Sequence, residues 1–295
     1  MTGHRAAYAY GLAAVLLWST VATAFKLALR YMAPAQLLLG ATVVSLGVLV
    51  LLLAVQGKLR LVWACTPRQY VRSLVLGFLN PFLYYTILLA AYDRLPAQVA
   101  QPLNYTWAFA LAVLAALLLG QRLRWGEMGA AGVSYIGVVI IATGGQWTGW
   151  QGIDGLGIGL ALGSTVVWAL YWIWSARDER DPLVVLTLNA AAALPFVWAY
   201  CAWVGQVEWV APAGLAGAAY VGVFEMGLAF ACWSLALQKT TDAARMGYLI
   251  FISPFVSLVF IHFLLGEAVR PATLMGLVFI VGGLLLQRRL QAKTG

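Results

Sequence analysis

Few polar side chains in this sequence are of the types, and at the spacing, that a catalytic or ligand-binding site needs. Those few favour a binding site over a catalytic one. Glu225 is the one acidic residue well inside a long apolar stretch, and the only histidines are His4 and His262. An embedded enzyme needs a nucleophile, an acid and a base close together at depth. No His, Cys, Asp and Glu cluster has the spacing of a metal site. We therefore expect no enzyme, no cofactor and no bound metal.

Glu225 itself needs an explanation, because a charge at the centre of an apolar span costs about 2.5–3.5 kcal/mol on insertion scales. The carboxylate could take up a proton or contact a ligand ammonium. The alternative is a neutral carboxylic acid that is hydrogen-bonded to a neighbouring helix. Trp233 lies two turns further along, on roughly the same side of the helix.

Amide and aromatic side chains gather in two earlier apolar stretches. They are Asn80, Tyr84, Gln98, Gln101, Asn104, Tyr105 and Trp107. Pro81 removes one backbone hydrogen bond beside Asn80, while Gln98, Gln101 and Tyr105 share one helical face. Amides donate and accept hydrogen bonds, and aromatic rings offer flat apolar surface. The set suits a small zwitterion or a polar aromatic ligand; the alternative is hydrogen bonding between helices.

Five of the 13 tryptophans fall towards the centres of apolar stretches, where lipid does not require an indole N–H. They are Trp18, Trp107, Trp168, Trp172 and Trp233. Trp168 and Tyr171 continue a helical stripe that we expect to face the protein interior, and Lys26 lies on a comparable stripe near the N-terminus. For Lys26 the sequence leaves open whether the ammonium faces inward or reaches the membrane surface.

The elements that must position these residues are membrane-spanning helices. The chain is 63% hydrophobic and 9% charged, against about half and about a quarter in soluble proteins. Apolar stretches long enough to span a bilayer fall at 8–29, 34–55, 70–91, 97–119, 127–146, 155–175, 182–204, 212–236, 243–265 and 271–290. The net charge of +8 is spread thinly between them, so we expect no nucleic-acid partner.

The basic residues indicate how the helices are oriented. With the N-terminus in the cytoplasm, 14 of the 18 lie on the inner side, as the positive-inside rule requires. These are Arg5, Lys58, Arg60, Arg68, Arg72, Arg122, Arg124, Arg177, Arg180, Lys239, Arg245, Arg288, Arg289 and Lys293. The bias predicts two cytoplasmic termini and an even number of spans.

An internal repeat accompanies this pattern. Residues 103–124 and 249–270 share seven identities in 22 positions, including Gly120 with Gly266 and Arg124 with Arg270. With five spans in each half, the second copy would enter the membrane from the opposite side. Inverted repeats of this kind build alternating gates in secondary transporters. An old duplication kept only for packing is the alternative.

These features resemble the drug/metabolite transporter superfamily over essentially the whole chain. The resemblance rests on the order of Trp18-Ser19-Thr20, Gly120-Gln121 and Gly266-Glu267 among ten apolar stretches. Within the superfamily, Asn104-Tyr105-Thr106-Trp107 with Trp168 and Trp233 resembles the bacterial inner-membrane aromatic amino-acid exporters. That resemblance implies a central cavity that opens alternately to each side, with Tyr105, Trp107 and Trp168 in its wall. Ala108 follows Trp107 where those exporters tend to have proline, which bears on the substrate range.

We therefore predict an all-α integral membrane protein with ten helices in two inverted five-helix repeats, residues 1–148 and 149–295. Both termini are cytoplasmic and the protein lies in the bacterial inner membrane. It would export amino acids, preferably aromatic, and related metabolites by alternating access. The predicted substrate-binding residues are Tyr84, Tyr105, Trp107, Trp168, Asn80, Gln98, Gln101, Asn104, Tyr171 and Trp233, with Glu225 as the candidate for proton coupling.

Two other functions stay open at this point. One is a broad-specificity exporter of drugs or cationic metabolites, coupled to protons through Glu225. The other is a membrane-embedded enzyme, which the small number of reactive side chains disfavours. The expected partners are a small-molecule substrate and the lipid bilayer.

Overall fold

The computed structural model describes residues 2–120, 125–145, 154–208, 211–240, 246 and 249–292. Within these ranges every regular element is a helix, so the all-helical prediction is confirmed there. Gln121 and the predicted boundary at 148–149 lie outside the described residues. The first part of the chain forms α1 (Thr2–Ser19), α2 (Val21–Ala28), α3 (Pro34–Val55), α4 (Arg60–Trp63), α5 (Pro67–Gly77), η1 (Phe78–Leu83), α6 (Tyr84–Arg94), α7 (Ala97–Asn104), α8 (Trp107–Leu119) and α9 (Trp125–Ala142).

The second part of the chain is also a series of helical segments. It comprises α10 (Gly155–Ser175), α11 (Pro182–Trp203), α12 (Pro212–Tyr220), η2 (Val221–Ala229), α13 (Phe230–Lys239), η3 (Leu249–Ile252), α15 (Ser253–Phe260), η4 (Ile261–Leu265) and α16 (Pro271–Ala292). Proline stands at the first turn of α11 and α12, where its missing N–H costs nothing and its φ suits the helix.

Seven continuous helical stretches are long and apolar enough to cross a membrane, at Arg5–Ala28, Pro34–Val55, Pro67–Arg94, Ala97–Leu119, Gly155–Ser175, Pro182–Trp203 and Pro212–Lys239. Three shorter apolar helices, Met128–Ala142, Leu249–Leu265 and Pro271–Gln287, fall in the remaining apolar windows. The chain is therefore a multi-pass membrane protein, and the total of ten spans remains a prediction.

Several spans are broken near their middle, which the apolar windows alone did not predict. Asn80 has a non-helical backbone (φ −148°, ψ 120°) and precedes Pro81 through a cis peptide bond. Thr20 separates α1 from α2, and Tyr105 and Thr106 separate α7 from α8. The segment η2 is π-helical, a wider helix that occurs frequently at functional sites. Asn80 and Tyr105, two of the predicted site residues, therefore lie at breaks between helical segments.

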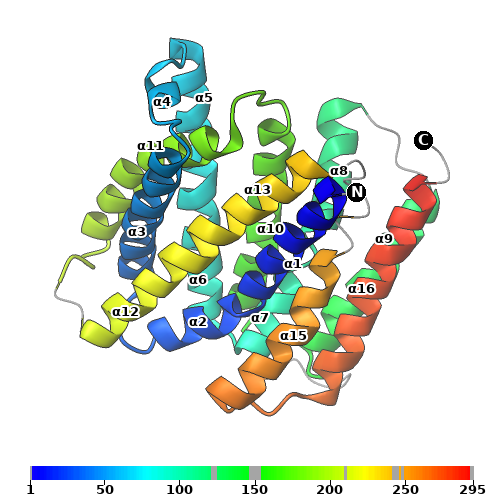
Figure 1. Cartoon of the computed structure of the whole chain (residues 1–295). Coiled ribbons are helices and arrows are strands. Elements are labelled where there is room, and N and C mark those ends of the chain that lie inside the picture. Colours follow the sequence, from blue (N-terminus) through cyan, green and yellow to red (C-terminus); the bar gives the residue numbers. More distant parts are fainter. Residues whose placement is uncertain are drawn as a thin grey trace.

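Figure 1 shows the arrangement of the helices. α9 and α16 run side by side along one edge of the bundle, α3 and α11 lie towards the opposite edge, and α1, α6, α10 and α13 lie between them. The start of α1, the end of α16 and the short α4 all lie towards the top of this view. The central helices therefore enclose the interior of the bundle.

Glycines bring α9 and α16 close together. A Cβ on Gly276 would lie 2.6 Å from the carbonyl oxygen of Gly137, and one on Gly283 would lie 2.6 Å from that of Ala130. Ser134 Oγ donates a hydrogen bond of 2.9 Å to the Ile280 carbonyl across the same contact. Small residues and interhelical hydrogen bonds replace the hydrophobic effect as the force that joins helices in lipid.

Replacing Gly283 with alanine is expected to destabilise the fold by about 1–3 kcal/mol, because the added methyl group meets backbone that cannot move aside. Gly282→Ala is the matched control, since a Cβ there meets nothing within 4 Å. Thermal unfolding of both variants in detergent measures the difference. Equal unfolding temperatures for the two variants would contradict this account of the α9–α16 contact.

Candidate functional site

A cavity of about 780 Å³ lies between the central helices, within the usual size range of small-molecule sites. Eight of the predicted site residues line it: Tyr84, Gln101, Asn104, Tyr105, Trp107, Trp168, Glu225 and Trp233. The residues come from helices far apart in the sequence, including α6, α7, α10, η2 and α13. These eight predicted residues therefore lie around one cavity.

Aromatic rings form much of the cavity wall. The ring of Trp168 lies 4.5 Å from that of Tyr84 and 5.8 Å from that of Phe230, measured between centroids. Trp18 extends the wall, with its ring 5.6 Å from Phe230 and 5.5 Å from Trp233. Edge-to-face and offset pairs at such distances stabilise one another. The result is a preformed aromatic surface that suits a planar apolar group.

Glu225 places a carboxylate on this surface from the π-helical segment η2. Its side chain is held on one side only: Tyr85 Oη donates to Oε1 at 2.8 Å, while Oε2 is buried without a hydrogen-bond partner. Only 8% of the residue is exposed. A buried acceptor without a partner is costly, so Oε2 is available to a donor that enters the cavity.

Two amide side chains of the cavity wall, Asn104 and Gln101, differ in whether their polar atoms already form hydrogen bonds. Asn104 is engaged at both ends, because Oδ1 accepts from Tyr84 Oη at 3.2 Å and Nδ2 donates to Ser164 Oγ at 3.0 Å. Gln101 Oε1 is buried and has no partner. Asn104 therefore positions Tyr84 in the wall, whereas Gln101 keeps an acceptor free for a ligand.

Three predicted site residues lie elsewhere. Gln98 does not reach the cavity, because its amide is bonded to the connection that leads into α16: Nε2 donates to the Ala268 carbonyl at 2.9 Å, and Oε1 accepts from Arg270 N at 3.0 Å. Asn80 and Tyr171 line a separate space of about 20 Å³. The break in the backbone at Asn80 accounts for its separation from Tyr84.

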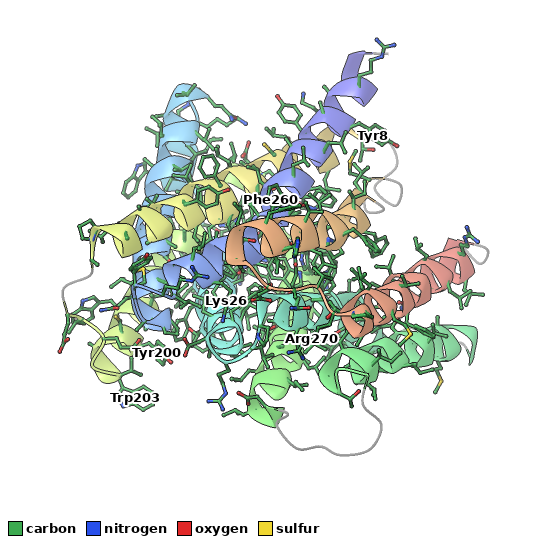
Figure 2. All side chains as sticks on the ribbon, turned by 90° about the horizontal axis from the view of Figure 1, so that it is seen from below. Tyr8, Lys26, Tyr200, Trp203, Phe260 and Arg270 are labelled. Carbon is green, nitrogen blue, oxygen red and sulfur yellow. The ribbon has the colours of Figure 1, made fainter. Side chains whose placement is uncertain are left out.

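Gln98 belongs to a group of contacts that closes one end of the cavity, here called the closed end. The Glu267 carboxylate accepts from Ala97 N at 3.1 Å and from Gln98 N at 3.3 Å, and so caps the positive N-terminus of α7. Lys26 Nζ donates to the carbonyls of Tyr92 (2.8 Å) and Leu95 (3.1 Å). Lys26 therefore faces inward. Figure 2 views the molecule from this end, with Lys26 and Arg270 near the centre.

The opposite end of the cavity, here called the open end, is lined where several helices finish. Leu119 ends α8, Arg177 follows α10, and Leu237 and Gln287 lie in the last turns of α13 and α16. Arg177 is exposed. A ligand that enters here passes Arg177 before it reaches Glu225.

The predicted site lacked several aromatic residues of the described cavity wall and its one basic residue. They are Trp18, Tyr92, Trp172, Arg177 and Phe230. Trp18 and Trp172 carried a usable signal, since both are tryptophans at depth that lipid does not require. Phe230 carries none, because a phenylalanine in an apolar span looks the same whether it faces lipid or a cavity.

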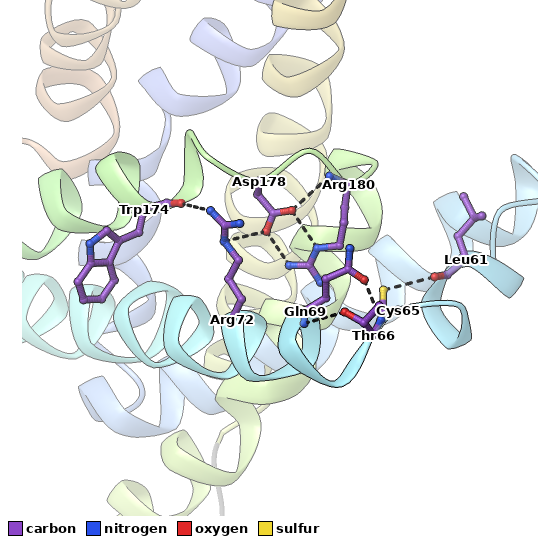
Figure 3. Close-up of polar contacts among 8 residues, drawn as sticks. All are labelled: Leu61, Cys65, Thr66, Gln69, Arg72, Trp174, Asp178 and Arg180. Carbon is purple, nitrogen blue, oxygen red and sulfur yellow. Dashed lines mark hydrogen bonds and ion pairs between the residues drawn. The ribbon is translucent and has the colours of Figure 1, made fainter. Parts of the chain in front are cut away.

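An ionic cluster beside the open end ties the α10–α11 connection to α5 (Figure 3). Arg180 Nη2 lies 2.6 Å from Asp178 Oδ2, Arg72 Nε lies 3.5 Å from the same oxygen, and Arg72 Nη2 donates to the Trp174 carbonyl at 2.9 Å. Partial burial of Asp178 opposes its ionisation, but the hydrogen bonds from Arg180 and the charge of Arg72 outweigh burial and lower the pKa of Asp178.

Asp178→Asn is expected to destabilise the protein at pH 7 and to lose that effect in acid. A carboxyl whose pKa is lower in the folded state stabilises that state above its ordinary pKa of 3.8, and the stabilisation disappears as the pH falls through the lower folded-state value. Unfolding temperatures of both proteins, measured from pH 7 down to pH 3, test this. Asp93→Asn, at an exposed residue, is the control. A gap that stays constant with pH would refute the prediction.

Comparisons with known proteins agree with this architecture. The sequence profile of the EamA-like transporter family matches residues 5–143 and 155–288. The chain is 27% identical over 282 residues to a protein of Ancylobacter novellus named aromatic amino acid exporter YddG, covering 92% of this chain and 93% of the relative. It is 25% identical over 280 residues to the uncharacterized transporter YvbV of Bacillus subtilis, covering 92% and 88%.

A third relative and a solved structure extend the comparison. A probable terminal-alkyne amino-acid exporter of Streptantibioticus cattleyicolor is 25% identical over 185 residues, 60% of this chain and 59% of the relative. A crystal structure with 23% identity superposes with a TM-score of 0.69 over 96% of this chain and 98% of the other, and supports the fold alone. These relatives are named as transporters or exporters, none as an enzyme. The chain belongs to the EamA-like transporter family, within the drug/metabolite transporter superfamily.

Proposed function

We propose that the protein exports amino acids, aromatic ones preferred, together with related small metabolites, across the bacterial inner membrane. The observation that carries the proposal is the aromatic cavity in which Glu225 Oε2 and Gln101 Oε1 are buried acceptors without partners. A ring would pack against Tyr84 and Trp168 while an ammonium group binds Glu225 and Gln101. The two curated amino-acid exporters among the relatives support the same substrate class.

The proposed orientation of an amino acid follows from the charges along the cavity. An ammonium group forms a charge-assisted hydrogen bond with a carboxylate, which directs it towards Glu225. The carboxylate would then point to the open end, where Arg177 is the cationic residue of the described cavity wall. Tyr105, Trp107 and Trp233 complete the apolar enclosure.

Transport would proceed by alternating access between two inverted halves, residues 1–148 and 149–295, each with five spans. With both termini in the cytoplasm, the open end faces the cytoplasm, because Arg177 and the end of α16 lie there. The contacts of Glu267, Gln98 and Lys26 would then hold the outer gate shut. Export requires these contacts to separate while the open end closes over the substrate.

A second candidate, a broad exporter of drugs or cationic metabolites driven by protons, is favoured by one observation. Glu225 lines a cavity with an open end and its Oε2 has no hydrogen-bond partner, so the same oxygen could take a proton or a cation in turn. Such competition would couple export of a cation to entry of a proton.

A growth assay tests the proposed function in cells. Bacteria that produce the protein are grown with a toxic aromatic amino-acid analogue, such as 4-fluorophenylalanine, and the intracellular analogue is measured. Export predicts a lower internal concentration and better growth than in cells producing the Glu225→Gln variant. Equal internal concentrations in cells that produce the protein and in cells that lack it would contradict the proposal.

A further inference from the structure

The charged side chains of the cavity wall are unequally placed: among its described lining residues Glu225 is the acidic residue and Arg177 the basic one. Three buried side-chain atoms among its described lining residues have no hydrogen-bond partner: Glu225 Oε2, Gln101 Oε1 and Trp172 Nε1. Two of them are acceptors, and one belongs to a carboxyl group. The single donor is a neutral indole N–H. The one ionisable group among these unpartnered atoms is therefore the carboxyl group of Glu225.

The remaining polar groups nearby do not correct this imbalance. Asn104 is bonded at both ends, and Tyr84 Oη is already used to donate to Asn104. The ammonium of Lys26 is held by two backbone carbonyls at the closed end. Arg177 is exposed and lies beyond the last turn of α10. Among the described lining residues, no cationic side chain therefore lies at the depth of Glu225.

The two charged ends of an amino acid are consequently recognised unequally. A buried ion needs a compensating charge or several hydrogen bonds. Glu225 can supply a carboxylate and Gln101 an acceptor oxygen to an ammonium. A carboxylate at the same depth would meet neutral donors only, together with the repulsion of Glu225. The carboxylate of a substrate therefore contributes little to its binding in the deep part of the cavity.

From this imbalance we infer that the protein also binds and exports arylalkyl amines, aromatic amines that lack a carboxylate. The inference rests on the proposed function, since it places the amine in the same cavity as the amino acid. An arylalkyl amine retains both recognised parts, the ring and the ammonium, and loses the part for which the deep cavity has no charged partner. An aryl carboxylate that lacks the ammonium would be excluded.

The test is a competition experiment on purified protein in liposomes. Counterflow of labelled phenylalanine is measured against tyrosine, tyramine and 3-(4-hydroxyphenyl)propionate, which share one ring and differ only in their charged groups. We expect tyramine to inhibit at concentrations within about tenfold of tyrosine, and the propionate to need at least about tenfold more than tyramine. Labelled tyramine should itself exchange, above its rate in protein-free liposomes.

Two variants identify the group responsible. Glu225→Gln should raise the concentration of labelled tyramine needed for half-maximal exchange at least about tenfold, equivalent to about 1.4 kcal/mol, while Glu208→Gln at an exposed position should leave it unchanged. Phenylalanine counterflow with no exchange of tyramine, or with the propionate the better inhibitor, overturns the inference and leaves the proposed function standing. Tyramine exchange without phenylalanine counterflow supports recognition of the amine and refutes amino-acid export. Absence of both refutes both.

Discussion

Replacing Glu225 with glutamine is expected to lower the transport of aromatic amino acids about 10- to 100-fold. Oε2 of Glu225 is an unpartnered carboxyl oxygen of the cavity wall, and a hydrogen bond to a charged group contributes about 1.5–3 kcal/mol. Glutamine keeps the volume of the side chain and an acceptor oxygen, so the loss reports the charge. The measurement is the concentration dependence of phenylalanine counterflow in liposomes.

The same variant tests proton coupling. If Glu225 exchanges a proton for the substrate ammonium, a pH gradient should accelerate export by the parent protein and leave Glu225→Gln unaffected. Tyr85→Phe removes the hydrogen bond to Oε1 without removing the charge and should have a smaller effect. A Glu225→Gln variant that transports and responds to the gradient as the parent does would remove Glu225 from both roles.

Trp168→Ala is expected to raise the substrate concentration needed for half-maximal transport about tenfold or more. Trp168 lies in van der Waals range of Tyr84 and also faces Phe230 and Trp172. Its removal takes away part of the aromatic surface against which the substrate ring is proposed to pack, and aromatic pairs contribute about 0.5–1.5 kcal/mol beyond the area they bury. The maximal rate should change less than the apparent affinity.

Two further variants separate binding from folding, because a buried Trp→Ala change can cost about 3–5 kcal/mol of stability. Trp168→Phe keeps a ring and should fall between the parent and alanine in apparent affinity. Trp63→Ala, at a residue that is 83% exposed, controls for the loss of an indole. If both Trp168 variants fold and bind phenylalanine as tightly as the parent, the pocket assignment is wrong.

Hydropathy was sufficient to predict the helices, because every apolar window holds at least one and lipid permits few alternatives. It could not predict the breaks within them. At Asn80 the chain leaves helical geometry, so the one-turn relation that places Asn80 above Tyr84 in a regular helix does not hold. The proline beside Asn80 was visible in the sequence, but the direction in which the chain bends depends on the helices packed around it.

Helical spacing also grouped Gln98 with Gln101, and only Gln101 reaches the cavity. Gln98 lies in the first turn of α7, where the connection before α16 arrives from a distant part of the chain and occupies its amide. No local pattern predicts such a contact. Glu225, which lines the cavity, drew attention in the sequence for the opposite reason: a carboxyl group at depth is unusual on its own.

Export of aromatic amino acids is best tested by counterflow. Liposomes that contain the purified protein are loaded with an excess of unlabelled amino acid, and the uptake of labelled phenylalanine is measured. We expect protein-dependent accumulation of labelled phenylalanine when the liposomes contain phenylalanine, tyrosine or tryptophan, and much less accumulation when they contain alanine. We also expect Glu225→Gln to abolish most of the signal. Absence of accumulation with every aromatic amino acid, in liposomes that contain folded protein, would contradict export of aromatic amino acids.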